Sequence, residues 1–559
     1  MKNLDLVLNT VCKLTSFHCG QCPIGPQSSF KYRFTAEPAG TFFYHSHVPY
    51  QMGDGVFGAF IVQDPDNDPY YADGQLIAQD VVIGLSDWMR YTSDTVYQFV
   101  SQFRVDIWPL SHYISFLNGQ QDFSFVVQPG ATYRLRIYCA TVEFGYRLFF
   151  TGGHRMTVIA ADGGLVQPVE TDYLDIYSGE RYDVLLAADQ EVGTYQLLAN
   201  VLTFTGKLKK EVIYGNMVYK GAVVDTSNTQ ARVTDTADRL AAFRNVDPAL
   251  TLLDSNRLTA YRDIATDKFH DDYQPVPGPA ELMPDPWVYK TTSYAVVHEP
   301  QFKFMDAWDN HFHHASFRNS TPLLFLGEND ALATFASQES RTITVTAYSN
   351  ESQTHSATLG PRLEFLELDE TIDIIFENAA ANDADLGLFD AYHPMHIHGH
   401  SVWAVAVGEG KFDAHMATAK ANFVDPPMRD NVVVPPSSWV WVRLRASNPG
   451  LWLMHCHTET HAVFGMMTVW VVGEAADRPL PPADFAVCGT AGRGWRKSPH
   501  FRSWLGLLLL ASVLVAILSA SLLFRLWHQR RRARFLPYHR VQMKRSGRRT
   551  CGSRERRDS

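Results

Sequence analysis

The sequence has few cysteines for its length and few basic residues before its last segment. Seven cysteines are scattered over 559 residues, an odd number that fits neither a dense disulfide framework nor paired zinc knuckles. Residues 1–524 contain 36 lysines and arginines against 57 aspartates and glutamates, a formal charge of −21. Because nucleic acid is bound through basic side chains, this balance argues against a nucleic-acid partner.

Long helical patterns are also scarce, and short aromatic and β-branched runs take their place. Most of these runs are bounded by Gly, Pro, Asn or Asp, as strands are. The expected strands include residues 41–44, 59–62, 133–138, 440–445 and 467–472. We therefore predict an all-β chain.

Polar stretches rich in Pro and Asp divide the sequence into blocks. The predicted organisation is a partial first domain at 1–66, a second domain at 75–222, a connecting segment at 223–287, a third domain at 288–475, a juxtamembrane segment at 476–503, an apolar helix at 504–524 and a basic tail at 525–559. The first block is too short to close a two-sheet sandwich of about 100 residues. Residues 178–183 are expected to be turn and strand without metal ligands.

One long apolar run stands near the C-terminus. Residues 504–524 are 21 residues without a charge, the length of a helix that crosses a bilayer. The 13 lysines and arginines of residues 525–559 favour a cytoplasmic tail. A lipid-anchor signal is the alternative, but such a signal normally ends in its apolar stretch. We predict a single-pass type I plasma-membrane protein with extracellular domains. The possible N-glycosylation triplets at Asn319 and Asn350 are consistent with an extracellular location of those domains.

Histidines gather in three segments at a spacing that chance rarely produces. The segments are His45-Ser46-His47, His393-Pro394-Met395-His396-Ile397-His398-Gly399, and His455-Cys456-His457-Thr458-Glu459-Thr460-His461 with Met466 beyond. On a strand, residues i and i+2 share a face while residue i+1 points to the other. His455 and His457 can therefore serve one metal site while Cys456 serves a second.

The donor types in these segments point to copper. A cysteine thiolate, two imidazoles and a weak axial methionine form the trigonal site of blue-copper electron transfer. Cys456, His461 and Met466 supply three of those groups, and His393 can supply the other imidazole. Clusters of imidazoles alone suit further copper ions and leave room for dioxygen. Zinc is the competing metal, but structural zinc sites favour closed sets of four ligands with paired cysteines.

These segments resemble the copper-binding signatures of multicopper oxidases. The stretches that are most similar to animal and fungal laccases are Gln21-Cys22-Pro23-Ile24, Tyr44-His45-Ser46-His47, Asp54-Gly55 and Asn448-Pro449-Gly450-Leu451-Trp452, and the likeness covers nearly all of residues 20–490. The resemblance implies consecutive cupredoxin-like Greek-key β-sandwiches. It also implies a disulfide between Cys22 and Cys488.

The resemblance further implies a role for each candidate ligand. The implied type 1 copper ligands are His393, Cys456 and His461 with Met466 axial, the type 2 ligand is His396, and the type 3 ligands are His45, His47, His398, His455 and His457. A complete family member holds four copper ions. Electrons from a small reductant pass through Cys456 to His455 and His457, and dioxygen is reduced to water. Glu459 resembles an acid that supports proton delivery, although a strand-end carboxylate is an alternative role.

The sequence departs from the family near its start. The family carries an earlier His-x-His-Gly segment, whereas here His18-Cys19-Gly20 is the nearest stretch, so six of the eight cluster histidines are present. Residues 1–5 are not followed by the apolar core of a signal peptide. We therefore expect a complete type 1 site, an incomplete trinuclear site, and a chain that is truncated or carries an alternative start.

Three functions stay open at this point. The first is laccase-like oxidation of phenols, aromatic amines or related small reductants. The second is ferroxidase activity on Fe²⁺, for which Asp390 could help to bind the cation or could cap a loop. The third is a catalytically silent cell-surface module that keeps the cupredoxin scaffold.

Overall fold

The computed structural model describes residues 3–10, 24, 28–71, 79–96, 113–203, 208–222, most of 253–290, 295–297, 341–347, 354–359, 363–378, 391–463 and 466–479. The chain divides into two compact units, residues 1–488 and 489–559, and the described residues all belong to the first. Predictions about Cys22, Cys488, Asp390, the glycosylation triplets and the apolar run 504–524 concern residues outside the described ones. Within the described part, no helix is long and apolar enough to cross a membrane.

Short strands dominate the described chain, as predicted. The five expected strand runs lie in β3 (Gly40–His45), β4 (Phe57–Val62), β8 (Thr132–Ala140), β26 (Ser438–Arg445) and β28 (Met467–Val472). The helices for which the structure gives bounds are short: η1 (Met52–Asp54), α5 (Ala414–Lys420) and α6 (Glu459–Val463). Among the described residues, the predicted β-sheet architecture with few helices is confirmed.

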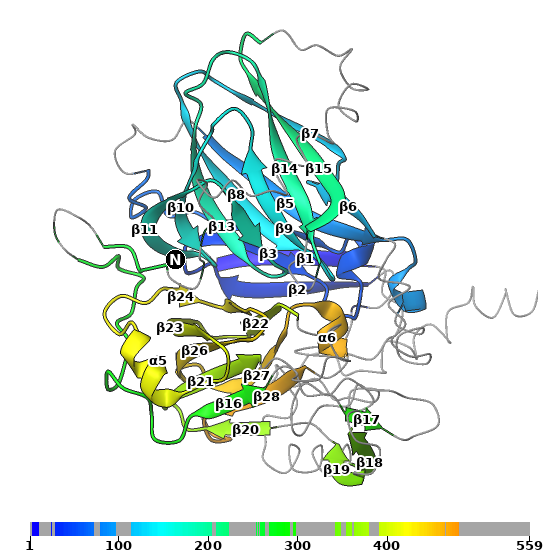
Figure 1. Ribbon diagram of the computed structural model, residues 1–559, viewed down its shortest axis with the longest axis vertical. Helices are drawn as coiled ribbons and strands as arrows, with labels where there is room; N and C mark the ends of the chain where they lie inside the picture. The colour runs from blue at the N-terminus through cyan, green and yellow to red at the C-terminus, as the bar shows by residue number, and fades with distance from the viewer. Residues whose placement is uncertain are drawn as a thin grey trace, which may run out of the picture. The chain divides into compact units, whose positions relative to one another are not determined.

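The second block forms two facing sheets (Figure 1). The six-stranded sheet has the order β11 (Gly164–Thr171), β10 (Met156–Ala161), β13 (Arg181–Ala187), β8, β5 (Gln79–Met89) and β6 (Tyr113–Leu117). The five-stranded sheet has the order β12 (Leu174–Ile176), β9 (Gly145–Phe150), β14 (Thr194–Leu202), β15 (Leu208–Tyr219) and β7 (Asp122–Val127). Parallel pairing of β5 with β8 and of β15 with β7 makes both sheets mixed.

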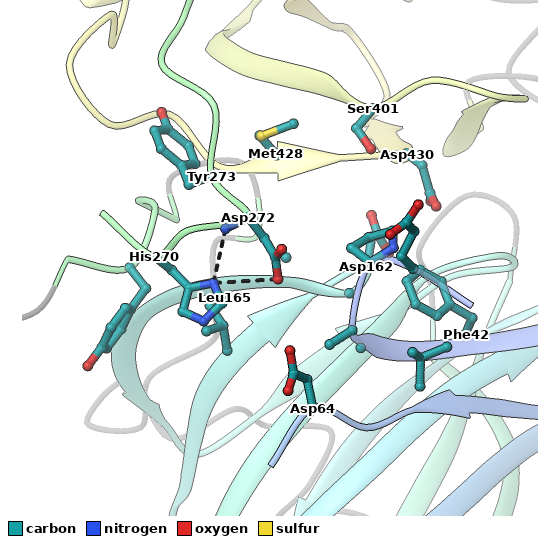
Figure 2. Close-up of a pocket in the computed structure, with 18 of the residues that line it drawn as sticks. Phe42, Asp64, Asp162, Leu165, His270, Asp272, Tyr273, Ser401, Met428 and Asp430 are labelled. Atoms are coloured by element: carbon teal, nitrogen blue, oxygen red, sulfur yellow. Dashed lines mark hydrogen bonds and ion pairs between the residues drawn. The ribbon is translucent and has the colours of Figure 1, made fainter. Parts of the chain in front are cut away.

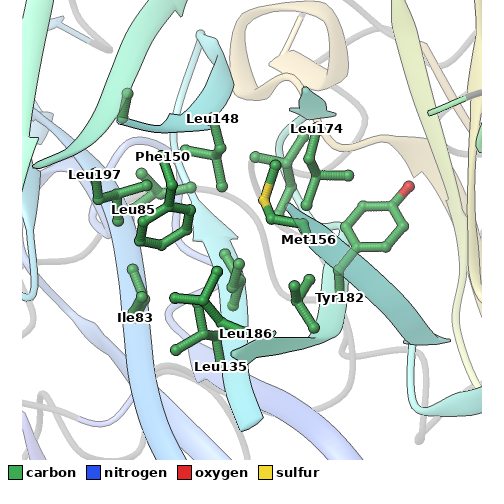
Figure 3. Packing of buried hydrophobic residues seen from close by; sticks show 14 of the residues in the cluster. Ile83, Leu85, Leu135, Leu148, Phe150, Met156, Leu174, Tyr182, Leu186 and Leu197 are labelled. Atoms are coloured by element: carbon green, nitrogen blue, oxygen red, sulfur yellow. The ribbon is translucent and has the colours of Figure 1, made fainter. Parts of the chain in front are cut away.

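The core of this sandwich lies between its two sheets, where alternate residues of each strand point inward (Figure 3). Ile83 and Leu85 of β5 and Leu135 of β8 are fully buried in the same cluster as Leu148 and Phe150 of β9. Burial of such side chains stabilises the fold by about 1.5–3 kcal/mol each. The second block therefore has a hydrophobic core of its own.

The third block repeats this two-sheet plan. One sheet has the order β16 (Trp287–Lys290), β21 (Thr371–Asn378), β26, β23 (Val402–Glu409) and β24 (Met428–Arg429), and the other has the order β20 (Leu363–Leu366), β28, β27 (Gly450–Cys456), β22 (His393–Ile397) and β25 (Asn431–Val434). A further small sheet contains β17 (Ala295–Val297), β18 (Arg341–Ala347) and β19 (Thr354–Leu359). Phe376, Val442 and Trp470 are buried in the cluster between the two large sheets.

The first block consists of two strand pairs, β1 (Asn3–Thr10) with β2 (Ser28–Thr35), and β3 with β4. Strand β3 docks on the second sandwich, where the Thr41 hydroxyl donates to the Asp183 carboxylate and accepts from Arg136. A buried cluster then joins Tyr50 of the first block, residues of the second, and Leu453 of the third. Because β3 ends at His45, this junction brings the first histidine pair to the third block.

The placement of the core predicts where a side-chain truncation is costly. Leu135→Ala should lower the free energy of unfolding by about 2–5 kcal/mol because it leaves a cavity. Val126 on β7 is 62% exposed, so the control Val126→Ala should change that free energy by less than about 0.5 kcal/mol. Urea unfolding followed by tryptophan fluorescence measures both variants, and equal effects would contradict this core.

Candidate metal centre

Strand β27 ends in the residue pair around which the metal-ligand side chains are arranged. In its register with β22, His455 pairs with His396 and Cys456 pairs with Met395. Because side chains alternate along a strand, Cys456 shares a face with Met395 and therefore with His393, two residues earlier. His455 shares the opposite face with His396. Adjacent residues of one strand thus point to two different places.

The first donor group is His393, Cys456 and His461, whose ligand atoms all lie within 4.8 Å of one another. The Cys456 Sγ atom is 3.8 Å from Nδ1 of His393 and 3.5 Å from Nδ1 of His461. The two Nδ1 atoms are 3.2 Å apart. Met466 is buried beside this group, and its carbonyl accepts a hydrogen bond from the Cys456 N–H at 3.0 Å. The structure thus brings together the four residues predicted for the type 1 site.

The second donor group is His47, His398 and His455, with ligand atoms again within 4.8 Å of one another. The His455 Nε2 atom lies 3.3 Å from Nε2 of His47 and 3.1 Å from Nε2 of His398. His47 follows β3 and His398 follows β22, so the group joins the first block to the third. Three segments far apart in sequence therefore meet at one point.

The three other predicted histidine ligands surround this second group. The ring centres of His45 and His457 are 5.1 Å apart, and those of His396 and His457 are 5.7 Å apart. His45 also stacks on Phe43 of the same strand, with ring centres 5.3 Å apart. Six imidazoles consequently gather on one side of β27, and the trio described above is the tightest part of this cluster.

Hydrogen bonds determine which nitrogen several of these rings can offer to a metal. Nδ1 of His45, His396 and His455 lies 3.0, 2.7 and 2.8 Å from the main-chain oxygens of Ser46, Asp430 and Cys456, respectively. A carbonyl oxygen accepts only, so each Nδ1 carries the proton and donates it. The neutral ring then keeps its lone pair on Nε2, the nitrogen that binds a metal.

Burial keeps these donor groups uncharged in the metal-free protein. Desolvation lowers the pKa of His461 and of His45 to about 4, and it lowers the pKa of His455 well below its usual value. Burial also raises the pKa of Cys456 to about 12, which favours the protonated thiol. The imidazoles are therefore ready to bind a cation, whereas the thiol must lose a proton to do so.

The residues present fit copper. Neutral imidazole nitrogens converge on His455 Nε2 without a charged group between them, and a cation placed there would satisfy their lone pairs. In the first group a soft sulfur donor is added to two imidazoles, which is the donor set that copper prefers. In addition, Nε2 of His393 is buried and has no hydrogen-bond partner among the described residues.

Residues of the second sandwich and of the segment before β25 also support the histidines. The Ser178 hydroxyl oxygen lies 2.8 Å from Nδ1 of His457. Arg181 binds the Asp430 carboxylate through two nitrogens, at 2.6 and 2.7 Å, and the Asp430 carbonyl is the oxygen that His396 contacts. From the sequence, residues 178–183 are expected to form turn and strand without metal ligands. The residue types in this segment do not indicate a contact with a metal ligand, because serine and arginine are common in turns.

Two acidic side chains near the donor groups have raised pKa values. Glu459 is half-buried at the first position of α6, and burial raises its pKa to about 7. Burial raises the pKa of Glu143 to about 8, and this side chain is in hydrogen-bonding reach of Thr460, the residue before His461. Both carboxyl groups can therefore gain or lose a proton near neutral pH. The sequence indicated Glu459 but not Glu143.

A cavity of about 400 Å³ is lined in part by His396, which belongs to the histidine cluster around the second donor group. Figure 2 shows other residues of its lining. Phe42 and Asp64 of the first block, Asp162 of the second and Asp430 near β25 line it. His270 and Tyr273 of the connecting segment lie across from them. A molecule as small as dioxygen or water can thus approach His396, whose side chain is 22% exposed.

Family models described as multicopper oxidase match residues 16–67, 79–222 and 330–476 of this chain. The chain is 28% identical over 518 residues to an L-ascorbate oxidase of Cucurbita pepo var. melopepo, covering 84% of each chain. It is 27% identical over 486 residues to Laccase-1 of Arabidopsis thaliana, covering 82% of this chain and 80% of the relative.

Solved structures show the same fold. The structure of Fet3p, a multicopper oxidase that functions in iron import, aligns with a TM-score of 0.57 at 22% identity and covers 81% of this chain and 76% of its own. The laccase of Botrytis aclada aligns with a TM-score of 0.56 at 21% identity and covers 83% of this chain and 76% of its own. At these identities the likeness bears on the fold alone, which is the predicted cupredoxin-like one.

The two buried cysteines offer a matched test of the first donor group. Cys456→Ser should lose one bound copper and the blue absorption, because the thiolate that produces this colour is removed. Cys139→Ser changes the other described free cysteine, which is also buried, and should keep both properties. Copper analysis and visible spectra measure these outcomes.

The variants Cys456→Ser and Cys139→Ser also test whether copper binding releases the thiol proton. Because the Cys456 pKa is raised to about 12, the thiol is protonated at neutral pH, and copper binding at this group should release one proton. Calorimetry in two buffers of different ionisation enthalpy counts that proton. The release should disappear in Cys456→Ser and persist in Cys139→Ser. Blue protein without Cys456 would refute the assignment.

Proposed function

Because the chain belongs to the multicopper oxidase family, whose members are oxidoreductases that use dioxygen, we propose that it takes single electrons from a small organic reductant. The reductants we propose are phenols, aromatic amines and related molecules such as ascorbate. Copper is the cofactor that the family implies. The type 1, type 2 and type 3 assignments of the ligands are part of this proposal.

One observation carries the proposal more than any other. His455 and Cys456 are consecutive residues, yet they belong to two separate donor groups. A single peptide unit consequently connects a site suited to accepting electrons with a site suited to dioxygen. His393, Cys456 and His461 would hold a copper ion for taking up electrons from the reductant, and the imidazoles around His455 would hold the copper needed to pass four electrons to dioxygen.

The chain's own residues hold the donor groups rigidly, keep water away from them and supply protons. Cys456 is fully buried, and His393, His455 and His457 are at most 5% exposed, so the donors are shielded from water and fixed by packing. Antiparallel pairing of β27 with β22 and β28 holds the donors of the two groups in register. Glu459, with its pKa raised to about 7, can hold and release protons near the histidines.

The names of the relatives support an organic reductant. Several similar proteins are L-ascorbate oxidases or laccases, whose names denote oxidation of small organic molecules.

Ferroxidase activity is the second candidate. Glu143 and Glu459 lie close enough to interact electrostatically, and carboxylate oxygens suit Fe²⁺ as well as organic hydroxyl groups. A catalytically silent module is the third candidate, and the same assay separates all three.

Oxygen consumption by the copper-loaded protein tests this function. With a diphenol or ascorbate, one dioxygen should disappear for every four electrons donated, at a higher kcat/KM than with Fe²⁺. His398→Ala should lower kcat by more than about 100-fold, since loss of a residue that merely supports a ligand already costs about 10–100-fold. His415→Ala, at an exposed position of α5, should leave kcat unchanged.

The competing outcomes are distinct. Turnover of Fe²⁺ in preference to all organic reductants would establish the ferroxidase. A fully copper-loaded protein without oxygen consumption would favour the silent module.

We also propose that residues 504–524 tether the protein to the plasma membrane, with the donor groups outside the cell. The uncharged 21-residue run and the basic tail after it support this localisation. Expressed with a cleavable secretion signal, the full chain should sediment with membranes, resist alkaline carbonate and be released by detergent. A variant that ends at residue 503 should stay in the supernatant. A full chain that is soluble without detergent would contradict the proposal.

A further inference from the structure

The turn between β12 and β13 of the second sandwich touches a histidine of the third block. Ser178 and His457 are both buried, 2% and 5% exposed, and the Ser178 Oγ atom lies 2.8 Å from Nδ1 of His457. The same Oγ atom also contacts the carbonyl oxygens of Thr141 and of His457 itself. A domain in which we identify no metal ligand thus reaches the metal-ligand cluster.

The partners of Ser178 determine the direction of this hydrogen bond. The hydroxyl has one proton, and the carbonyl oxygens of Thr141 and His457 can only accept it. The Ser178 Oγ atom therefore donates to a carbonyl and accepts from Nδ1–H of His457. With its proton on Nδ1, the neutral His457 ring keeps its lone pair on Nε2.

The turn itself is held rigidly against the ring. The Ser178 carbonyl accepts a hydrogen bond from Asn431 Nδ2 at 2.9 Å, and the Glu180 carboxylate accepts one from the Tyr177 N–H at 2.8 Å. Gly179 has a φ of +85°, and a Cβ atom there would lie 2.3 Å from Asn431 Nδ2 and 2.6 Å from a ring carbon of His457. A side chain at position 179 would therefore collide with the imidazole of His457, and glycine lets the turn pass close to the ring.

We propose that Ser178 is a positioning residue, which fixes the Nδ1–H tautomer and the orientation of His457 so that Nε2 faces the other imidazoles. This role goes beyond ligand identity, because it assigns part of the metal centre to the second sandwich. His45, His396 and His455 have main-chain carbonyls as the acceptors for Nδ1. His457 instead has a side chain from another block as its acceptor, so a substitution can remove it.

The inference rests on the proposed function only in its copper readout, because tautomer and orientation are properties of the metal-free chain. Ser178→Ala leaves Nδ1–H of His457 without its acceptor in a buried place. The neutral ring can then move its proton to Nε2, and a protonated nitrogen cannot bind a metal. Loss of such a supporting partner typically weakens metal binding by about 10–100-fold.

The first experiment is nitrogen NMR of the metal-free full chain with ¹⁵N-labelled histidine, and the His457 signals are assigned by their loss in His457→Gln. The wild-type protein should show a protonated Nδ1 and an unprotonated Nε2. Ser178→Ala should show a substantial population with the proton on Nε2. Ser178→Thr keeps a hydroxyl group and should therefore retain the wild-type tautomer. This variant can still be measured if Ser178→Ala does not fold.

The second experiment is a copper titration of the same variants. In Ser178→Ala, copper at the histidine cluster should bind about 10–100-fold more weakly, while the blue absorption of the Cys456 group stays unchanged. Thr171→Val is the matched control, since Thr171 is a buried hydroxyl that donates to the Tyr173 carbonyl within the same sandwich. It should alter neither the tautomer nor copper binding.

Three outcomes would overturn the inference. These are an unchanged His457 tautomer in Ser178→Ala, an equal loss of copper from both donor groups, and a similar loss in Thr171→Val. A shifted tautomer in a protein without oxidase activity would support the role of Ser178 and count against the proposed function, so the two failures are distinguishable.

Discussion

The alternation of side chains at the end of β27 is the constraint on which the rest of the metal centre depends. His455 faces the imidazole cluster and Cys456 faces the group of His393 and His461, because successive residues of a strand point to opposite sides. A slip of one residue between β27 and β22 would exchange these faces and dismantle both groups. Pairing with β28 on the other edge of β27 helps to prevent that slip.

This constraint explains why three blocks are needed around one strand. The first block delivers His45 and His47 from the end of β3, and the third block carries the other donors. The second supplies contacts instead of donors: Arg181 binds Asp430, and Ser178 binds His457. Arg429 adds buried ion pairs to Asp162 and Glu180 across the same boundary. Such pairs contribute little net stability but favour one arrangement of the blocks, because a misplaced buried charge is costly.

The sequence alone allowed the strands and the division of donors on β27 to be predicted, because both follow from a period of two within a few residues. Contacts between blocks could not be found in this way. Ser178 and His457 are 279 positions apart, and nothing near Ser178 marks it as a partner of an imidazole. Glu143 was missed for the same reason, since its raised pKa comes from burial beside Thr460, which local residue patterns do not encode. The family resemblance supplied ligand roles, but it did not supply these supporting contacts.

The most direct test of this account is a crystal structure of the copper-loaded protein with anomalous diffraction measured at the copper absorption edge. One anomalous peak should be bound by Cys456, His393 and His461, and separate anomalous density should lie among the histidines that include His455. Copper that is bound by both Cys456 and His455, or an absence of copper at Cys456, would contradict the division of adjacent residues between two sites.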